Sequence, residues 1–206
     1  MEIRNVVFDF GNVIIDWRPH LALEHLFASE AEMDRILRDI GFYEWNLRLD
    51  GGLDPEAGLE EVRRDRPAHA EIFEVYIRRI DRAHSRLVPG TCDLIEALHA
   101  NQLRLFGLTN ANGLGVQAAK RTASPIHLME DVVVSAEVGL LKPEPEIFTI
   151  LLQRNDLIAG ETLFVDDSAA NCAAAEAMGM WAHQFSSATA LEDELLRYGL
   201  LVRGAL

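Results

Sequence analysis

The order of apolar and polar positions divides the chain into a short first strand, a long helical stretch and an alternating remainder. The run Val6–Phe8 is β-branched and aromatic and stops at Asp9 and Gly11, which is typical of a buried strand that ends in a polar turn. From about residue 20 to residue 87, apolar residues recur at helical spacing without a convincing strand. This stretch predicts an insert of three to five helices.

After Pro89 and Gly90 the pattern alternates between strands and helices that are joined by short links. Strands are predicted at residues 103–108, 132–134, 162–165 and 180–185, and helices at 91–100, 145–153, 169–178 and 191–197, with one more helix between the first two of these strands. Such alternation predicts a parallel sheet with helices on both faces. We therefore expect an α/β fold, with a doubly wound, Rossmann-like core formed by residues 1–16 and 89–206 and an α-helical unit inserted at 17–88.

Polar side chains stand where the predicted strands stop. Asp9 and Thr109 directly follow strands, and Lys142 lies in a loop just past one. The acidic pair Asp166–Asp167 ends a further strand. In an open parallel sheet, ligands bind outside the carboxyl ends of the strands. We therefore expect these side chains, far apart in the sequence, to lie close together.

Asp9 and Lys142 carry groups suited to phosphoryl transfer. A carboxylate directly after a strand can attack phosphorus, and Gly11 lets backbone N–H groups approach a phosphate closely. The ammonium group of Lys142 would stabilise the transferring phosphoryl group. Thr109 and Asn110 add a hydroxyl and an amide, although such residues at strand ends also make local turns. The alternatives are an Asp9 that only caps a turn and a Lys142 that is solvated on the surface.

The acidic pair Asp166–Asp167 indicates a metal site. Adjacent acids at a buried strand end repel each other unless a cation or hydrogen-bond donors compensate them. Hard oxygen ligands without a nearby His or Cys favour Mg²⁺ over zinc. The alternative is a helix whose N-cap is Asp167 or Ser168, with one carboxylate exposed.

Four segments together resemble the motifs of the haloacid dehalogenase-like (HAD) hydrolase superfamily, in their usual order. The similarity is greatest to the branch that includes sugar-phosphate phosphatases and the phosphatase domain of epoxide hydrolases. The segments span residues 7–14, 107–110, 139–145 and 164–171, and the resemblance covers essentially the whole chain. It implies that residues 17–88 form the α-helical cap of that family.

The resemblance also implies a role for each matching residue. Asp9 would be the nucleophile and, with the carbonyl of Gly11 and the carboxylates of Asp166 and Asp167, a ligand of Mg²⁺. The residues expected to bind the phosphate or substrate are Phe10, Gly11, Asn12, Thr109, Asn110 and Lys142, of which Lys142 and Thr109 also count as catalytic. Asn171 would orient the acidic ligands from outside.

One position departs from the pattern of this superfamily's phosphatases. They usually carry a second Asp two places after the nucleophile, as general acid and base, and here that place holds Gly11. General acid–base catalysis is worth about a hundred- to ten-thousandfold in rate. We therefore expect a slow enzyme, or one restricted to good leaving groups.

These observations predict a Mg²⁺-dependent phosphatase that hydrolyses a small phosphomonoester, such as a sugar phosphate, through an aspartyl-phosphate. One alternative is a 2-haloacid dehalogenase, which needs no metal and would leave Asp166 and Asp167 to repel its anionic substrate. The other is a binding protein without turnover, an interpretation that only Gly11 supports.

Residues 43–52 are the richest mixed polar and aromatic segment of the predicted cap. The functional hypothesis is that Asn46 or Arg48 faces the core and binds the non-phosphate part of the substrate, because a cap that closes over the site must present polar groups to it. The alternative is a structural helix, with Trp45 and Leu49 packed inside the cap and Arg48 solvated.

Composition limits the partners and the location. The formal net charge is −14, with 19 Lys and Arg against 33 Asp and Glu, which argues against a nucleic-acid partner. No apolar run approaches the roughly 18 residues of a membrane span, so we expect a cytoplasmic protein. Cys92 and Cys172 are expected to be free thiols. A monomer or homodimer acting on a small phosphorylated metabolite is the expected form.

Overall fold

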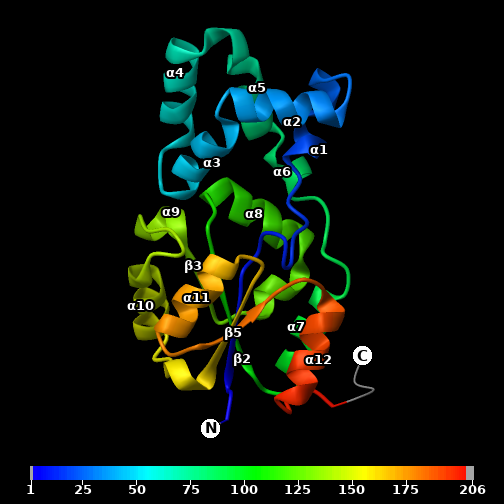
Figure 1. Ribbon diagram of the computed structural model, residues 1–206, viewed down its shortest axis with the longest axis vertical. Helices are drawn as coiled ribbons and strands as arrows, with labels where there is room; N and C mark the ends of the chain where they lie inside the picture. The colour runs from blue at the N-terminus through cyan, green and yellow to red at the C-terminus, as the bar shows by residue number, and fades with distance from the viewer. Residues whose placement is uncertain (1, 203–206) are drawn as a thin grey trace.

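The computed structural model describes residues 2–202 and has a sheet-based core below a helical unit (Figure 1). The sheet has five parallel strands in the order β3-β2-β1-β4-β5. Their bounds are β1 Asn5–Phe8, β2 Arg104–Thr109, β3 Asp131–Val134, β4 Thr162–Asp166 and β5 Trp181–Gln184. The α/β fold and the parallel sheet predicted from the alternating pattern are confirmed.

Strand register brings the predicted polar clusters to one edge of the sheet. The central strand β1 pairs with β2 through Phe8 and Gly107, and with β4 through Phe8 and Val165. The strands β1, β2 and β4 therefore end close to the same edge of the sheet. Asp9 directly follows β1 there, and Asp166 is the last residue of β4. The chain winds outward from β1 to β2 and β3, then crosses back over β1 to β4 and β5, so the site forms where the sheet's winding reverses.

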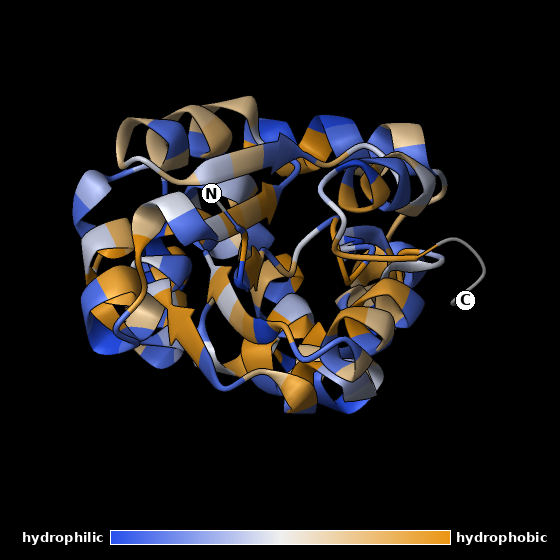
Figure 2. Ribbon diagram, turned by 90° about the horizontal axis from the view of Figure 1, so that it is seen from below, coloured by the Kyte–Doolittle hydropathy of each residue, from blue (hydrophilic) through white to orange (hydrophobic). Residues whose placement is uncertain are grey.

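Helices cover both faces of the sheet, and the inner parts of β1, β2 and β4 are apolar because neither face meets water there, whereas the edge strand β5 is partly exposed. One face packs on α7 (Thr91–Ala100), α8 (Gly113–Thr122) and α12 (Ala188–Arg197), and the other on α10 (Pro145–Arg154) and α11 (Ala169–Ala177). Apolar residues concentrate along the strands and the inner faces of these helices (Figure 2). The short segments are α9 (Ser135–Val138), η3 (Ser124–Leu128) and η4 (Ala159–Glu161).

The segment predicted to be inserted at residues 17–88, which we call the cap, contributes a hydrophobic cluster of its own. Its helices are α1 (Pro19–Leu23), α2 (Glu30–Asp39), α3 (Phe42–Asp50), α4 (Pro55–Asp65), α5 (Ala70–Arg78) and α6 (Ile80–Ala83), with the 3₁₀ segments η1 (Glu24–Leu26) and η2 (Pro67–His69). Six α-helices exceed the three to five predicted, because α1 and α6 are too short to show a helical repeat.

Aromatic rings fill the centre of the cap. The ring centroids of Phe42 and Tyr76 lie 4.9 Å apart, and those of Trp45 and Phe73 lie 4.8 Å apart. Trp45 and Leu49 are both buried in this cluster, as the structural interpretation of residues 43–52 expected. The last turn of α3 points down toward the core, above the strand ends (Figure 1).

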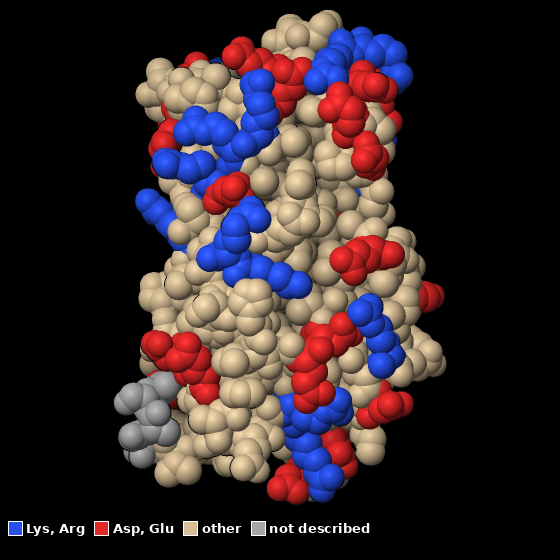
Figure 3. Space-filling model, turned by 180° about the vertical axis from the view of Figure 1, so that it is seen from behind, with Lys and Arg blue, Asp and Glu red and all other residues tan. Residues whose placement is uncertain are grey.

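The surface carries charges of both signs. On the face shown in Figure 3, Lys and Arg side chains gather over the cap with Asp and Glu beside them. Several of the cap's arginines are paired, as Arg63 is with Glu56 at 2.7 Å and with Glu74 at 2.8 Å. Cys92 and Cys172 are free thiols, as expected. Among residues 2–202, no helix combines the length and apolarity that crossing a membrane requires.

Candidate active site

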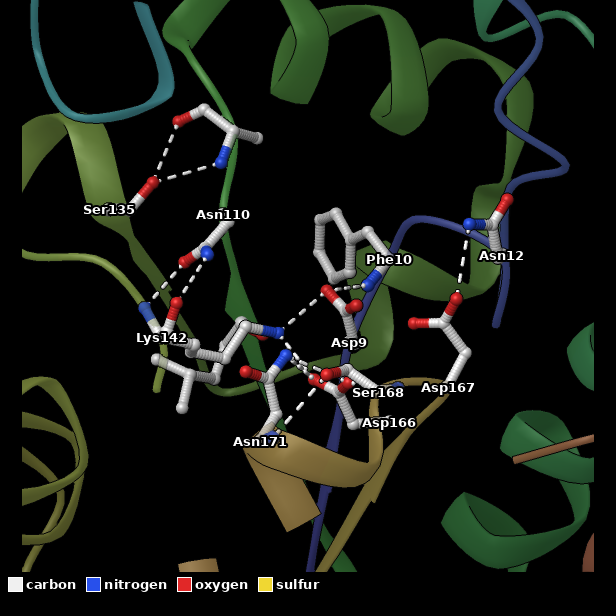
Figure 4. Close-up of polar contacts among 12 residues, drawn as sticks. Asp9, Phe10, Asn12, Asn110, Ser135, Lys142, Asp166, Asp167, Ser168 and Asn171 are labelled. Atoms are coloured by element: carbon white, nitrogen blue, oxygen red, sulfur yellow. Dashed lines mark hydrogen bonds and ion pairs between the residues drawn. The ribbon is translucent and has the colours of Figure 1, made fainter. Parts of the chain in front are cut away.

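Lys142 lies between two buried carboxylates at the carboxyl edge of the sheet (Figure 4). Its Nζ is 2.9 Å from Oδ1 of Asp9 and 2.7 Å from Oδ2 of Asp166, and it donates a third bond to the carbonyl of Leu108 at 2.8 Å. Only 4% of Lys142 and none of Asp166 is exposed. A charged amine is buried in this way only when it is paired and hydrogen-bonded. The surface-lysine alternative is therefore wrong.

The side chain of Asn110 fixes the backbone that carries this lysine. Its Nδ2 donates to the carbonyl of Lys142 at 2.9 Å, and its Oδ1 accepts from the N–H of Lys142 at 2.8 Å. We expected the Asn110 amide to bind phosphate. Both ends of this amide contact the backbone of Lys142, so the side chain positions the lysine. Phosphate binding by Asn110 and by its neighbour Thr109, which is buried at the same edge, stays a prediction.

Asp9, Asp166 and Asp167 can offer three carboxylate oxygens that all lie within 4.8 Å of one another. The amide of Asn171 donates to both oxygens of Asp166, at 2.9 and 3.1 Å, and the amide of Asn12 donates to Asp167 at 3.1 Å. Asn171 thus contacts the acidic pair as expected. Asn12 contacts the acids from an exposed position, with left-handed φ of 57°, and does not line the cavity between core and cap described below.

The N-terminus of α11 leaves both acidic side chains of the pair available. Its N-cap is Ser168, whose hydroxyl accepts from the N–H of Asn171. Of the two N-cap residues that the alternative named, Ser168 is confirmed and Asp167 is wrong. Asp166 does accept from the N–H of Ser168 at 2.8 Å, which holds it in place without neutralising it.

Negative charge exceeds positive charge in this cluster. The pKa of Asp9 is raised to about 6, mainly by burial and also by the nearby charge of Asp166, while Lys142 acts in the opposite direction. Three carboxylates against one ammonium group leave a site that a cation stabilises. The cluster is made only of hard oxygen ligands, which is the donor set that suits Mg²⁺.

The loop after β1 shapes the space beside Asp9. The N–H of Phe10 donates to Oδ1 of Asp9 at 2.7 Å, which fixes the direction of the carboxylate. A Cβ built on Gly11 would meet no atom within 4 Å. The place of the missing general acid is therefore open space, so the glycine is not required there by packing.

A cavity of about 150 Å³ connects the strand ends to the cap. Phe10, Gly11, Thr109 and Asn110 line it from the core, and Asn46 and Asp50 line it from α3. The structure therefore brings Asn46 to the same cavity as these four predicted phosphate binders, whereas Asn12 and Lys142 do not line it.

Arg48 does not reach this cavity, so its predicted substrate contact is wrong. Its guanidinium group pairs with Glu61, with Nη1 2.7 Å from Oε2, and about half of the side chain is exposed. The reason is helical geometry, because residues two apart lie about 200° apart around a helix. Asn46 and Asp50 are four residues apart and therefore lie on the same face of α3, whereas Arg48 lies on another face.

The sequence model of haloacid dehalogenase-like hydrolases matches residues 3–179, most of the chain and all of the site described above. The chain belongs to this hydrolase family. The similarity that the four motifs suggested is thereby confirmed.

Curated relatives of this HAD-like hydrolase include phosphatases. It is 27% identical to a phosphoglycolate phosphatase of Salmonella typhi over 86% of this chain and 79% of that protein. It is 25% identical to a D-ribitol-5-phosphate phosphatase of Bacteroides thetaiotaomicron over 94% of this chain and 97% of that protein.

A solved HAD family enzyme from Bacteroides thetaiotaomicron, in complex with magnesium and inorganic phosphate, has the same fold. The TM-score is 0.68 with 21% identity, over 90% of this chain and 95% of that one.

Three residues of the HAD-like site were missed in the sequence. Asp50 and Asn112 line the cavity, and Ser135 donates to the backbone carbonyl of Asp50. The sequence could have indicated Asp50, because it follows Asn46 by about one helical turn. Asn112 and Ser135 carried no comparable signal, since each is a single polar residue past a strand.

Proposed function

We propose that this hydrolase is a Mg²⁺-dependent phosphatase that cleaves a small phosphomonoester through an aspartyl-phosphate on Asp9. The observation that carries the proposal is the buried contact of Lys142 with Asp9 inside a cluster of three carboxylates. A carboxylate held against an ammonium group and beside a cation site is built to attack an anionic substrate. The phosphatase relatives and the magnesium and phosphate complex of the structural neighbour support the same function.

The proposed reaction has two chemical steps. An oxygen of Asp9 forms a bond to phosphorus while the bond from phosphorus to the leaving oxygen breaks, and the leaving group takes its proton from water. A second water then attacks phosphorus, which releases inorganic phosphate and restores the carboxylate of Asp9. Lys142 lowers the repulsion between that carboxylate and the phosphate, and Thr109 offers a hydroxyl to a phosphate oxygen. Bound Mg²⁺ would supply further positive charge at the phosphate, held by Asp9, Asp166, Asp167 and the carbonyl of Gly11.

One assay separates this function from its alternatives. Phosphate release from p-nitrophenyl phosphate is measured with Mg²⁺ and with EDTA, beside chloride release from 2-chloropropionate. We expect phosphate release that EDTA abolishes. Chloride release without metal would establish a dehalogenase, and silence on all substrates would establish a binding protein.

Removal of the exposed acid of the cluster tests the metal site. We expect Asp167→Ala to raise the Mg²⁺ concentration at half-maximal rate by about tenfold or more and to lower kcat, because a hard cation loses an anionic ligand. Titrating Mg²⁺ against both proteins measures this. Asp156→Ala, on an exposed turn, is the control. An unchanged half-saturation in the Asp167 variant would move the metal elsewhere.

The open space at Gly11 allows a gain of function. We expect Gly11→Asp to raise kcat/KM for an alkyl phosphate by about tenfold or more, because the new carboxyl can protonate a poor leaving group, while p-nitrophenyl phosphate gains little. Gly11→Ala is the control, and it should gain on neither substrate. Equal rates for both variants on the alkyl phosphate would show that protonation of the leaving group does not limit turnover.

A further inference from the structure

The cap side of the cavity presents a buried acid without a basic partner. Asp50, at the end of α3, is only 9% exposed. Its two carboxylate oxygens accept from the amides of Asn112 at 3.1 Å and Asn46 at 2.9 Å. Among the described residues, neither Lys nor Arg lines this cavity. Among residues 2–202, the donors to this carboxylate are therefore neutral, namely the side-chain amides of Asn46 and Asn112 and the backbone N–H of Asn112.

The amide of Asn46 leaves a hydrogen-bond acceptor unused. Asn46 is 8% exposed, and its Oδ1 is buried without a partner. When Asp50 is ionised its carboxylate only accepts, so the nitrogen of Asn46 then faces it and the oxygen faces elsewhere. A buried carbonyl without a donor is costly, and such groups in native proteins call for a partner. The unused oxygen, on a residue that lines the cavity, indicates a ligand with a donor group.

We propose that Asn46 and Asp50 form a recognition site for the leaving group, which selects phosphate esters of neutral polyols and rejects phosphate esters of hydroxy acids. The inference rests on the proposed phosphatase function and specifies its substrate class. A hydroxyl group donates to Oδ1 of Asn46 or to Asp50. A substrate carboxylate has no hydrogen to donate to either residue. Its negative charge would also lie close to that of Asp50, and this repulsion rejects the esters of hydroxy acids.

The other titratable groups of the cavity do not offset that repulsion. Burial raises the pKa of Tyr76, with Asp50 adding to the rise, and burial lowers the pKa of His84, so both are neutral near pH 8. Burial also raises the pKa of Asp50 to about 7, partly opposed by its bond from Asn112. Asp50 therefore gains its charge as the pH rises through about 7, and rejection of acidic esters should strengthen between pH 6 and pH 8.

Asp50→Asn separates recognition from folding. Turning the Asn46 amide by 180° would let its oxygen accept from the new amide, so the hydrogen bond between positions 46 and 50 is kept and the group without a partner becomes the Asn46 nitrogen. The raised pKa of Asp50 means that the free energy of unfolding falls as pH rises from about 4 to about 7, because the folded state holds the proton more tightly. Asp50→Asn has no group that ionises at this position, so its free energy of unfolding does not fall in this way. Its Tm at pH 8 should therefore equal or exceed that of the wild type.

Matched substrate pairs test the selection. Glycerol 3-phosphate and 3-phosphoglycerate, and ribitol 5-phosphate and 5-phosphoribonate, differ only in a terminal alcohol or carboxylate. At pH 8 we expect kcat/KM to favour the alcohol by about tenfold or more in at least one pair, the scale of one hydrogen bond to a charged group. Asp50→Asn should bring that ratio to within about threefold. Asn46→Ala should lower the rate on the alcohol without improving the acid.

Asp39→Asn, an exposed acid of α2, is the matched control and should keep the wild-type ratio. Equal kcat/KM within both pairs for an enzyme active on p-nitrophenyl phosphate would overturn the inference alone. A ratio unchanged in Asp50→Asn, with all substrates slowed alike, would also overturn it. Silence of the wild type on every phosphate ester would instead overturn the proposed function, and the inference with it.

Discussion

Asp9→Asn is expected to reduce phosphate release by about a thousandfold or more, because the amide matches the carboxylate in shape but cannot form an acyl-phosphate. The fold should be kept. Burial raises the pKa of Asp9 to about 6, so its charge opposes folding at neutral pH, and its removal should raise the free energy of unfolding by about 3 kcal/mol at most. Steady-state rates and thermal unfolding without metal measure both effects.

Deamidation back to the acid is the main artefact in that experiment, and intact-mass analysis of the variant controls for it. Retention of more than a few per cent of the wild-type rate in a sample free of deamidated protein would end the nucleophile assignment.

Lys142→Met is expected to have the opposite effect on stability and a similar effect on activity. The methionine fills much of the same volume but leaves Asp9 and Asp166 buried without the ammonium group that contacts both. Breaking a buried pair from one side costs about 3–5 kcal/mol. Urea unfolding measures the free energy, and phosphate release should fall by at least about a hundredfold, since the charge opposite the phosphate is lost.

Lys120→Met provides the matched control on the exposed face of α8. It should change neither quantity measurably, since an isolated surface charge contributes little. A Lys142 variant as stable as this control would mean that the two carboxylates do not depend on the lysine.

The sheet and the location of the site were predictable because both follow from local pattern. Buried parallel strands read as short apolar runs, and their ends share an edge, so Asp9, Lys142 and Asp166 could be grouped before any coordinates. The short helices α1 and α6 could not be predicted, because they are held by packing in the cap and show no repeat of their own.

Contacts between distant segments were the part that sequence could not supply. The Asn110 amide can form hydrogen bonds with a phosphate or with a backbone group. Its bonds to the backbone of Lys142 depend on how the loop that carries Lys142 packs, which the sequence does not show. In the cap, the choice between Asn46 and Arg48 depended on which face of α3 meets the core. The role of Asp50 depends on Asn112, which is 62 residues away in the chain.

The central claim is the aspartyl-phosphate, and its direct test is to trap it. Enzyme turning over p-nitrophenyl phosphate with Mg²⁺, whose leaving group needs no proton, is quenched in acid, reduced with borohydride and digested, since reduction converts a phosphorylated aspartate to homoserine. Without an acid at position 11 to activate water, breakdown of the intermediate is slow, so it should accumulate. The account predicts homoserine at position 9, only in the presence of substrate. An unmodified Asp9 in enzyme that is releasing phosphate, or homoserine at another aspartate, would contradict it.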